Sequence, residues 1–185
     1  MNVANDCSVA VSELAQVAAR IDPNEYDALI DALIGAERIF TLGGGRVGLM
    51  VRAFTMRLTH LRRRAFWIWD DTTPSIGPGD VLLVASGPCA GGVIEHIVKR
   101  AKSHGAGIIV VTADSNGPVG AYADVTAHIP AAAYLAKGDL VPTQQMMGSL
   151  FEQMLLIVLD CVALEMRRRL GLTVEETEAM HRNVE

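Results

Sequence analysis

The feature that most constrains this chain is a glycine-rich turn between an apolar run and a helical pattern. The turn reads Gly43-Gly44-Gly45-Arg46-Val47-Gly48. It follows strand-like residues Arg38–Leu42 and precedes an expected helix over Val47–Leu61. Such a junction directs free backbone N–H groups and the positive end of a helix dipole at one point. The turn therefore predicts a site for an anion, most often a phosphate.

Strands and helices are expected to alternate through the middle of the chain. After residues 38–42, strands are expected over 65–69, 81–85, 107–112 and 125–129, and a further helix over 92–103. These apolar runs show little two-residue alternation, which is typical of parallel strands that are buried on both faces. Short connections between alternating strands and helices predict a doubly wound α/β sheet.

Helices are expected at both ends of the chain. One covers about Val9–Arg20, and a second starts at Asp22, a good N-cap, with Glu25 placed to close a capping box. A long helix is expected over 145–170, followed by a short polar one over 174–181. Apolar residues surround the long helix on nearly all sides, so we expect it to be buried on more than one face, between subunits.

Composition narrows the class of protein. The length of 185 residues fits one domain, and the formal net charge of −5 argues against a general nucleic-acid binder. Three widely spaced cysteines predict no disulfide framework and no zinc site, and favour a reducing, cytoplasmic setting. The N-terminus lacks the order of a signal peptide, and the most apolar run, Met154–Leu159, is too short to span a bilayer. We expect no membrane partner.

The glycine turn by itself leaves two kinds of ligand open. It satisfies G-x-G-x-x-G, the fingerprint of dinucleotide-binding folds, in which an acidic residue closes the second strand. Asp70 and Asp71 follow the expected strand Ala65–Trp69 at about that place. Against a dinucleotide enzyme, the chain is short for a cofactor domain plus a substrate domain. A tight turn without a ligand is a third interpretation.

A second strand–turn–helix junction follows the expected strand Val81–Ala85. It reads Ser86-Gly87-Pro88-Cys89-Ala90-Gly91-Gly92. Two such turns at the carboxyl ends of neighbouring parallel strands would face one crevice. Cys89 near a helix start is a candidate for a lowered pKa, although a small residue that simply fits is the commoner case.

Three further side chains are candidates for proton transfer. Glu152 shares a helix face with Gly148 and Ser149, and its apolar neighbours make it a candidate for a raised pKa and a proton-transfer role. A structural ion pair or a cap fits the same spacing equally well. His60 and His181 lie near a helix end and the chain end, where histidines are more often packed, capping or exposed than catalytic.

Taken together, these segments resemble the sugar isomerase (SIS) domain, and within it the 6-phospho-3-hexuloisomerase group. The resemblance covers nearly the whole chain as one domain, with N-terminal helices over 1–36, a sheet core over 37–143 and C-terminal helices over 144–185. Four strings carry it. They are the glycine–arginine turn at 43–49, Phe-Thr-Met-Arg-Leu-Thr-His-Leu at 54–61, Met-Gly-Ser-Leu-Phe-Glu-Gln at 147–153, and the C-terminal His-x-Asn-x-Glu at 181–185.

The resemblance implies a three-layer αβα fold with a five-stranded parallel sheet of flavodoxin-like order. It implies a homo-oligomer, a dimer or usually a tetramer, with active sites at subunit boundaries and His181 acting from a neighbouring subunit. The implied reaction interconverts 3-hexulose 6-phosphate and fructose 6-phosphate through an enediolate, without metal or organic cofactor. Glu152 would be the base, and His60 or His181 would move hydroxyl protons or open the ring. Substrate and phosphate binding would fall to Gly44, Gly45, Arg46, Ser86, Gly87, Cys89 and Ser149.

The phosphate cradle departs from the family pattern. Val47 stands where a serine is usual, and Pro88-Cys89-Ala90 replaces most of a hydroxyl-rich loop. Each lost hydrogen bond to a charged group is worth roughly 1.5–3 kcal/mol, and Asp70 and Asp71 would repel a phosphate further. The chain could bind phosphate through backbone groups and Arg46, could isomerise another sugar phosphate or an unphosphorylated sugar, or could be a sugar-phosphate-binding protein without activity.

Overall fold

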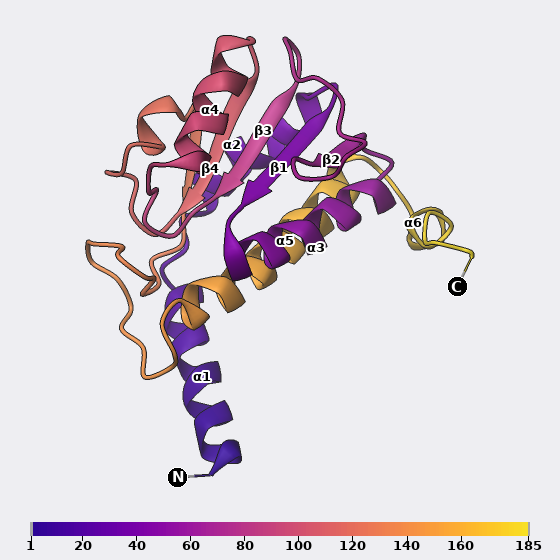
Figure 1. Cartoon of the computed structure of the whole chain (residues 1–185). Coiled ribbons are helices and arrows are strands. Elements are labelled where there is room, and N and C mark those ends of the chain that lie inside the picture. Colours follow the sequence, from indigo (N-terminus) through magenta and orange to yellow (C-terminus); the bar gives the residue numbers. More distant parts are fainter. Residues whose placement is uncertain (1, 185) are drawn as a thin grey trace.

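A five-stranded parallel sheet forms the centre of the molecule, seen in a computed structural model that describes residues 2–184 (Figure 1). The strands are β1 (Ile39–Gly43), β2 (Ala65–Trp67), β3 (Val81–Ala85), β4 (Gly107–Thr112) and β5 (Val125–His128). Their order is β2-β1-β3-β4-β5. The register pairs Gly43 with Ala85, so β1 and β3 end level with each other. The strand order reverses between these two strands, which is where doubly wound sheets bind ligands.

Helices cover both faces of the sheet. They are α1 (Val3–Ala18), α2 (Pro23–Gly35), α3 (Gly45–His60), α4 (Val93–Ser103), α5 (Ser149–Arg169) and α6 (Val174–Glu178), with a 3₁₀ turn, η1, at Gly120–Tyr122. One core cluster joins α2, α3 and α5 to the sheet, and a second joins α4 to the opposite face. The three-layer αβα fold with a flavodoxin-like parallel sheet is thereby confirmed.

Helices α3 and α5 lie side by side along one face of the sheet (Figure 1). They run in the same direction, since Arg46 of α3 pairs with Glu152 of α5, and Arg57 pairs with Asp160 about two to three turns further on. Both helices therefore begin at the same end of the molecule. The first residues of α5 are thus brought next to the glycine turn.

Helix α1 extends away from the body, and only its C-terminal part packs against α5 (Figure 1). It begins at Val3, six residues before the expected start, because the Asn2 side chain accepts a hydrogen bond from the Asn5 backbone N–H and caps it. Val17 is fully buried, whereas most of the first turns are exposed. Within one chain, the first turns of this amphipathic helix are therefore not covered by another element.

Two further sequence expectations differ from the structure. The long helix begins at Ser149 and not at Gln145, because Gly148 adopts a left-handed conformation (φ 83°) that ends the preceding segment. Asp22 caps α2 as expected, but Glu25 closes no capping box. Its carboxylate instead accepts hydrogen bonds from the backbone N–H of His128, at 2.7 Å, and pairs with His128 Nδ1 at 2.8 Å. A long-range contact between Glu25 of α2 and His128 at the end of β5 therefore takes the place of the expected local capping box.

Candidate active site

The glycine turn brings the start of α3 into close contact with the end of β1. A Cβ atom on Gly48 would lie 2.7 Å from the carbonyl oxygen of Gly43, and Gly45 has a positive φ of 53°. Gly44 is the N-cap residue and supplies no side-chain cap to α3. The turn therefore places Gly44, Gly45 and the first-turn N–H groups at the carboxyl edge of the sheet, as an anion site requires.

Arg46 meets Glu152 at this edge. Arg46 Nε donates to Glu152 Oε2 at 2.6 Å, so the turn after β1 is joined to the first turn of α5. The Glu152 side chain is 11% exposed and that of Arg46 is 65% exposed. A Cβ on Gly148 would lie 3.2 Å from Glu152 Oε1, so a glycine at this position leaves that oxygen room. One carboxylate is thus held in a nearly buried position beneath a cation that reaches solvent.

The second turn lies beside the same helix start. Ser86 directly follows β3 and is buried, and its backbone N–H donates to the carbonyl of Val111. A Cβ on Gly87 would lie 2.7 Å from Ala133 Cβ and 3.7 Å from Phe151, the residue before Glu152. Ser149 is the first residue of α5. Seven of the predicted site residues therefore gather at one edge of the sheet: Gly44, Gly45, Arg46, Ser86, Gly87, Ser149 and Glu152.

Cys89 belongs to this loop, but its thiol faces the protein interior. The residue is fully buried within the core cluster beneath α4, and its φ is 49°. Burial raises the pKa of the thiol, which a hydrogen bond with Thr112 only partly offsets. The lowered pKa considered from sequence is wrong, because the loop turns the side chain inward. Cys89, which is fully buried, therefore presents no thiol to a ligand in the crevice.

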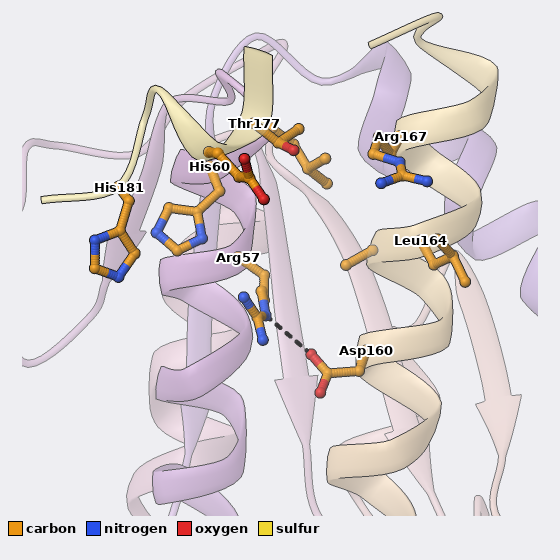
Figure 2. Close-up of a pocket in the computed structure, with 10 residues that line it drawn as sticks. Arg57, His60, Asp160, Leu164, Arg167, Thr177 and His181 are labelled. Atoms are coloured by element: carbon orange, nitrogen blue, oxygen red, sulfur yellow. Dashed lines mark hydrogen bonds and ion pairs between the residues drawn. The ribbon is translucent and has the colours of Figure 1, made fainter. Parts of the chain in front are cut away.

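The two histidines lie together at the opposite end of α3. The ring centroids of His60 and His181 are 5.6 Å apart, and Figure 2 shows both rings at the rim of a cavity between α3, α5 and α6. The cavity, of about 570 Å³, is also lined by Arg57, Asp160, Arg167 and Glu178. Burial, together with the charges of Arg57 and His181, lowers the pKa of His60.

One chain therefore divides the predicted catalytic set into two groups. His60 lies fourteen positions after Arg46 in α3, and at about 1.5 Å per residue this is about 21 Å along the helix. Within one chain, His60 and His181 cannot reach a molecule held by Glu152. Of the C-terminal string at 181–185, residue 185 lies outside the described residues.

The structure adds a buried carboxylate that the sequence analysis did not single out. Glu13 of α1 accepts hydrogen bonds from Thr143 Oγ1, the Gln144 backbone N–H and Gln145 Nε2, all at 2.7–2.8 Å. Gln145 in turn accepts from Gln153 Nε2 at 2.8 Å, next to Glu152. This network fixes the segment that leads into α5. Its sequence signal is weak, because Glu13 and Thr143 are 130 residues apart.

Among residues 2–184, no group of three or more His, Cys, Asp or Glu side chains is arranged to hold a metal ion. No helix in this part of the chain combines the length and apolarity that crossing a membrane requires.

Comparison with known proteins finds relatives that share one name and match nearly the full length of this chain. No protein-family model matches the chain. The chain is 34% identical to the 3-hexulose-6-phosphate isomerase of Mycobacterium gastri over 184 residues, which cover 100% of this chain and 92% of that protein. It is also 34% identical to the Bacillus subtilis enzyme of the same name, over 95% of each chain.

Solved structures agree with these relatives. A Methanococcus jannaschii protein, whose structure was reported to infer a molecular function of 3-hexulose-6-phosphate isomerase, superimposes with a TM-score of 0.81 at 31% identity, over 98% of this chain and 99% of that one. A phosphoheptose isomerase from Francisella tularensis shares the fold, with a TM-score of 0.67 at 14% identity over 90% and 96% of the two chains. With its strand order, its glycine turn and these full-length relatives, the chain belongs to the 3-hexulose-6-phosphate isomerase family of SIS-fold sugar isomerases.

Proposed function

We propose that this protein interconverts 3-hexulose 6-phosphate and fructose 6-phosphate. The relatives named above support this activity, and one observation in the structure supports it most directly. The Glu152 carboxylate lies nearly buried at the carboxyl ends of β1 and β3, 2.6 Å from Arg46. A positioned carboxylate beside a cation is what proton transfer next to a carbonyl group requires.

In this mechanism Glu152 is the general base. Its carboxylate takes the proton from C2 of 3-hexulose 6-phosphate, and the electron pair of the C–H bond forms the C2–C3 double bond of an enediolate. The electrons of the C3 carbonyl move onto its oxygen, where a nearby cation or N–H group stabilises the charge. A proton then moves from the oxygen on C2 to the oxygen on C3, and protonated Glu152 returns its proton to C3. The product has its carbonyl at C2, and no net proton is consumed.

Backbone groups and Arg46 would bind the phosphate. Val47, at a position where a hydroxyl is usual, packs against the core, and the Cys89 side chain of the altered second loop is buried. Gly44 and Gly45 leave the start of α3 open to an anion, and Arg46 is largely exposed on its outer side. Asp70 is paired with Arg52 at 3.4 Å, which offsets part of its repulsion of a phosphate.

The second proton-transfer group would come from another copy of the chain. His60 lies about 21 Å along α3 from Arg46, and His181 lies beside His60, so a complete site needs a histidine from a neighbouring subunit. Ile157 and Leu164 of α5 are 42% and 40% exposed, and α1 is only partly packed, which is consistent with a homo-oligomer. A dimer or tetramer in the cytoplasm, formed by the whole chain as one unit, completes the proposal.

The decisive experiment compares the parent protein with Glu152→Gln. We expect the parent to convert 3-hexulose 6-phosphate to fructose 6-phosphate, and the variant to lose at least about a hundredfold in kcat, which is the low end of a general base's contribution. Circular dichroism and the melting temperature check that the variant is folded. A variant as active as the parent would exclude Glu152 as the base.

Because the second loop is altered, a protein that binds sugar phosphates without converting them is the alternative, and the same experiment tests it. A protein that only binds sugar phosphates would show no turnover, but its melting temperature would rise with fructose 6-phosphate. Ligand at 100 times its Kd stabilises the folded state by about 2.7 kcal/mol. Stabilisation without turnover would therefore replace the isomerase proposal with a binding function.

A further inference from the structure

A second groove opens on the β2 side of the glycine turn, away from Glu152. Its volume is about 340 Å³, within the range of small-molecule sites. It lies between the start of α3, the end of β2 and the start of α4. The residues that line it are Gly43, Gly44, Gly45, Gly48, Leu49, Arg52, Trp67, Trp69, Val93 and Ile94. The mechanism proposed above uses none of the side chains in this groove.

Two tryptophans and three aliphatic residues give the groove apolar walls. Trp67 is nearly buried, and a Cβ on Gly48 would lie 3.2 Å from its ring, so the ring packs against the base of the turn. Trp69 is 52% exposed and Val93 is 61% exposed, although both line the groove. Large apolar side chains left open to water in a concave site indicate a ligand with an apolar surface.

The loop that carries Trp69 is firmly held. The Thr73 hydroxyl donates to the carbonyl of Trp67 at 2.6 Å, and the Asp70 backbone N–H donates to the same carbonyl at 3.0 Å. Arg52 of α3 pairs with Asp70 at 3.4 Å. These contacts fix the backbone on both sides of Trp69, so Trp69 lies in an ordered turn.

The polar groups of the groove are few. Among the lining residues of the described chain, Arg52 is the one with a charged side chain, and the glycines contribute backbone alone. A hydroxyl-rich open-chain sugar would leave several hydroxyl groups unpaired against Trp69, Leu49 and Val93, which is unfavourable. A ligand that joins a flat ring to an anionic group would place the ring against the apolar walls and the anion near the glycine turn.

The hollow next to the groove adds a carboxylate. Leu49, Arg52 and Trp67 line both hollows, and Asp70 lines the second one. A carboxylate that follows the second strand accepts hydrogen bonds from ribose hydroxyls in nucleotide-binding α/β sheets. The groove and the adjoining hollow thus offer an apolar ring wall, a cation and a carboxylate, the three kinds of group that can meet the base, the phosphate and the ribose of a nucleotide.

We propose that this groove binds a purine nucleoside 5′-monophosphate. The purine ring stacks on Trp69 and faces Val93 and Ile94, the phosphate meets Arg52 and the glycine backbone, and the ribose faces Asp70. The nucleotide shares the glycine turn with the sugar phosphate, and its base and ribose occupy surface that the isomerisation does not use.

Calorimetric titration of the full chain with AMP and with GMP tests the proposal. We expect saturable binding of at least one of them. Adenosine or guanosine, which lacks the phosphate, and ribose 5-phosphate, which lacks the ring, should each bind at least about tenfold more weakly. If neither nucleotide binds, or if ribose 5-phosphate binds as tightly as the nucleotide, the proposal is wrong.

Substitutions at Trp69 provide matched controls. Base–aromatic stacking is worth about 1–3 kcal/mol, so Trp69→Ala should weaken nucleotide binding by about tenfold or more, whereas Trp69→Phe, which keeps a ring, should stay within about threefold of the parent. Equal binding by Trp69→Ala and the parent would overturn the proposal. Arg52→Gln gives a second test, because it should weaken the nucleotide and leave the nucleoside unaffected.

The outcome is independent of whether the chain is an isomerase. Calorimetry needs no turnover, and Glu152→Gln should bind the nucleotide as the parent does because Glu152 does not line the groove. Nucleotide binding by a parent protein that shows no isomerase activity would contradict only the proposed catalytic function, and isomerase activity without nucleotide binding would contradict only the nucleotide site.

Discussion

Arg46 and Glu152 are 106 residues apart in sequence, and their side chains meet at 2.6 Å. Arg46 lies in the first turn of α3, where the helix dipole disfavours a cation. Its guanidinium is largely exposed, and exposed ion pairs contribute little to stability, about 0–1 kcal/mol. The position of Arg46 is therefore better explained by the carboxylate and the anionic ligand that it can hold than by the stability of the fold.

Replacement of Arg46 should act on substrate binding. A hydrogen bond to a charged group is worth about 1.5–3 kcal/mol, so Arg46→Gln should raise KM for the phosphorylated substrate by about ten- to hundredfold. Arg46→Lys keeps the positive charge but lacks the planar guanidinium group, so its KM should lie between that of Arg46→Gln and that of the parent. Steady-state kinetics with both variants measure this. An unchanged KM in Arg46→Gln would show that Arg46 does not hold the phosphate.

Mixed oligomers test whether the site is shared between copies. His60→Gln and Glu152→Gln should each be inactive alone, because each leaves every site without one group. If the two groups come from different chains, mixed oligomers of the two variants contain some sites with both groups intact and regain part of the parent activity. Co-expression with two affinity tags isolates such mixtures. No recovery in isolated mixed oligomers would contradict a shared site that uses His60.

Substitution of Gly48 should destabilise the protein. An added Cβ would lie 2.7 Å from the Gly43 carbonyl oxygen and 3.2 Å from the Trp67 ring, so Gly48→Ala should cost about 1–3 kcal/mol of unfolding free energy. Gly35→Ala is the matched control, since a Cβ there meets nothing within 4 Å. It should be neutral or stabilising by up to about 1 kcal/mol. Urea unfolding gives both values, and similar effects at the two positions would refute the close contact.

Glu13→Gln should destabilise the protein in a pH-dependent manner. Burial alone would raise the pKa of Glu13, but its hydrogen bonds from Gln144, Gln145 and Thr143 outweigh this and lower it. A lowered pKa in the folded state gives stability that is present above the unfolded pKa, about 4.5, and that is lost as the pH falls through the folded pKa. A glutamine brings an NH₂ group against three donors, which costs about 1–3 kcal/mol.

Unfolding experiments at pH 7 and at pH 3.5 measure this difference. We expect the gap in unfolding free energy between the parent and Glu13→Gln to be larger at pH 7. An equal gap at both pH values would show that the charge of Glu13 is not what the network requires.

His60 should limit stability on the acid side of neutrality. Its pKa is lowered by burial, by Arg57 and by His181, so the unfolded chain binds a proton more readily than the folded one. The sign is then fixed: above the unfolded pKa of about 6.5 the group has no effect, and its cost grows as the pH falls toward the folded pKa. Asp160, Arg167 and Glu178 are the other charged residues that line this cavity.

His60→Gln removes this proton-linked cost. The parent should lose more melting temperature than the variant between pH 7.5 and pH 5.5, and the two curves should converge at the higher pH. The group is only partly buried, so the effect should be modest. Parallel curves over the whole range would show that His60 is not linked to folding.

Much of the fold could be predicted because its signals are local. Strand β3 at Val81–Ala85 and strand β4 at Gly107–Thr112 have the predicted bounds, since buried parallel strands are nearly continuous apolar runs between turn residues. The predicted start of the long helix at residue 145 is wrong, because the start of α5 depends on the left-handed backbone of Gly148 and the apolar pattern extends beyond it.

The sequence by itself determined the order of strands and helices, the glycine turn and the residue types around it, because each depends on neighbours within a few positions. Tertiary structure alone decided which of them meet. Parallel packing of α3 and α5 brings Arg46 to Glu152 and carries His60 to the far end, beside His181. The inward turn of the second loop buries Cys89. Such contacts depend on strand order and helix direction, which are set by burial of the whole core and which no short segment encodes.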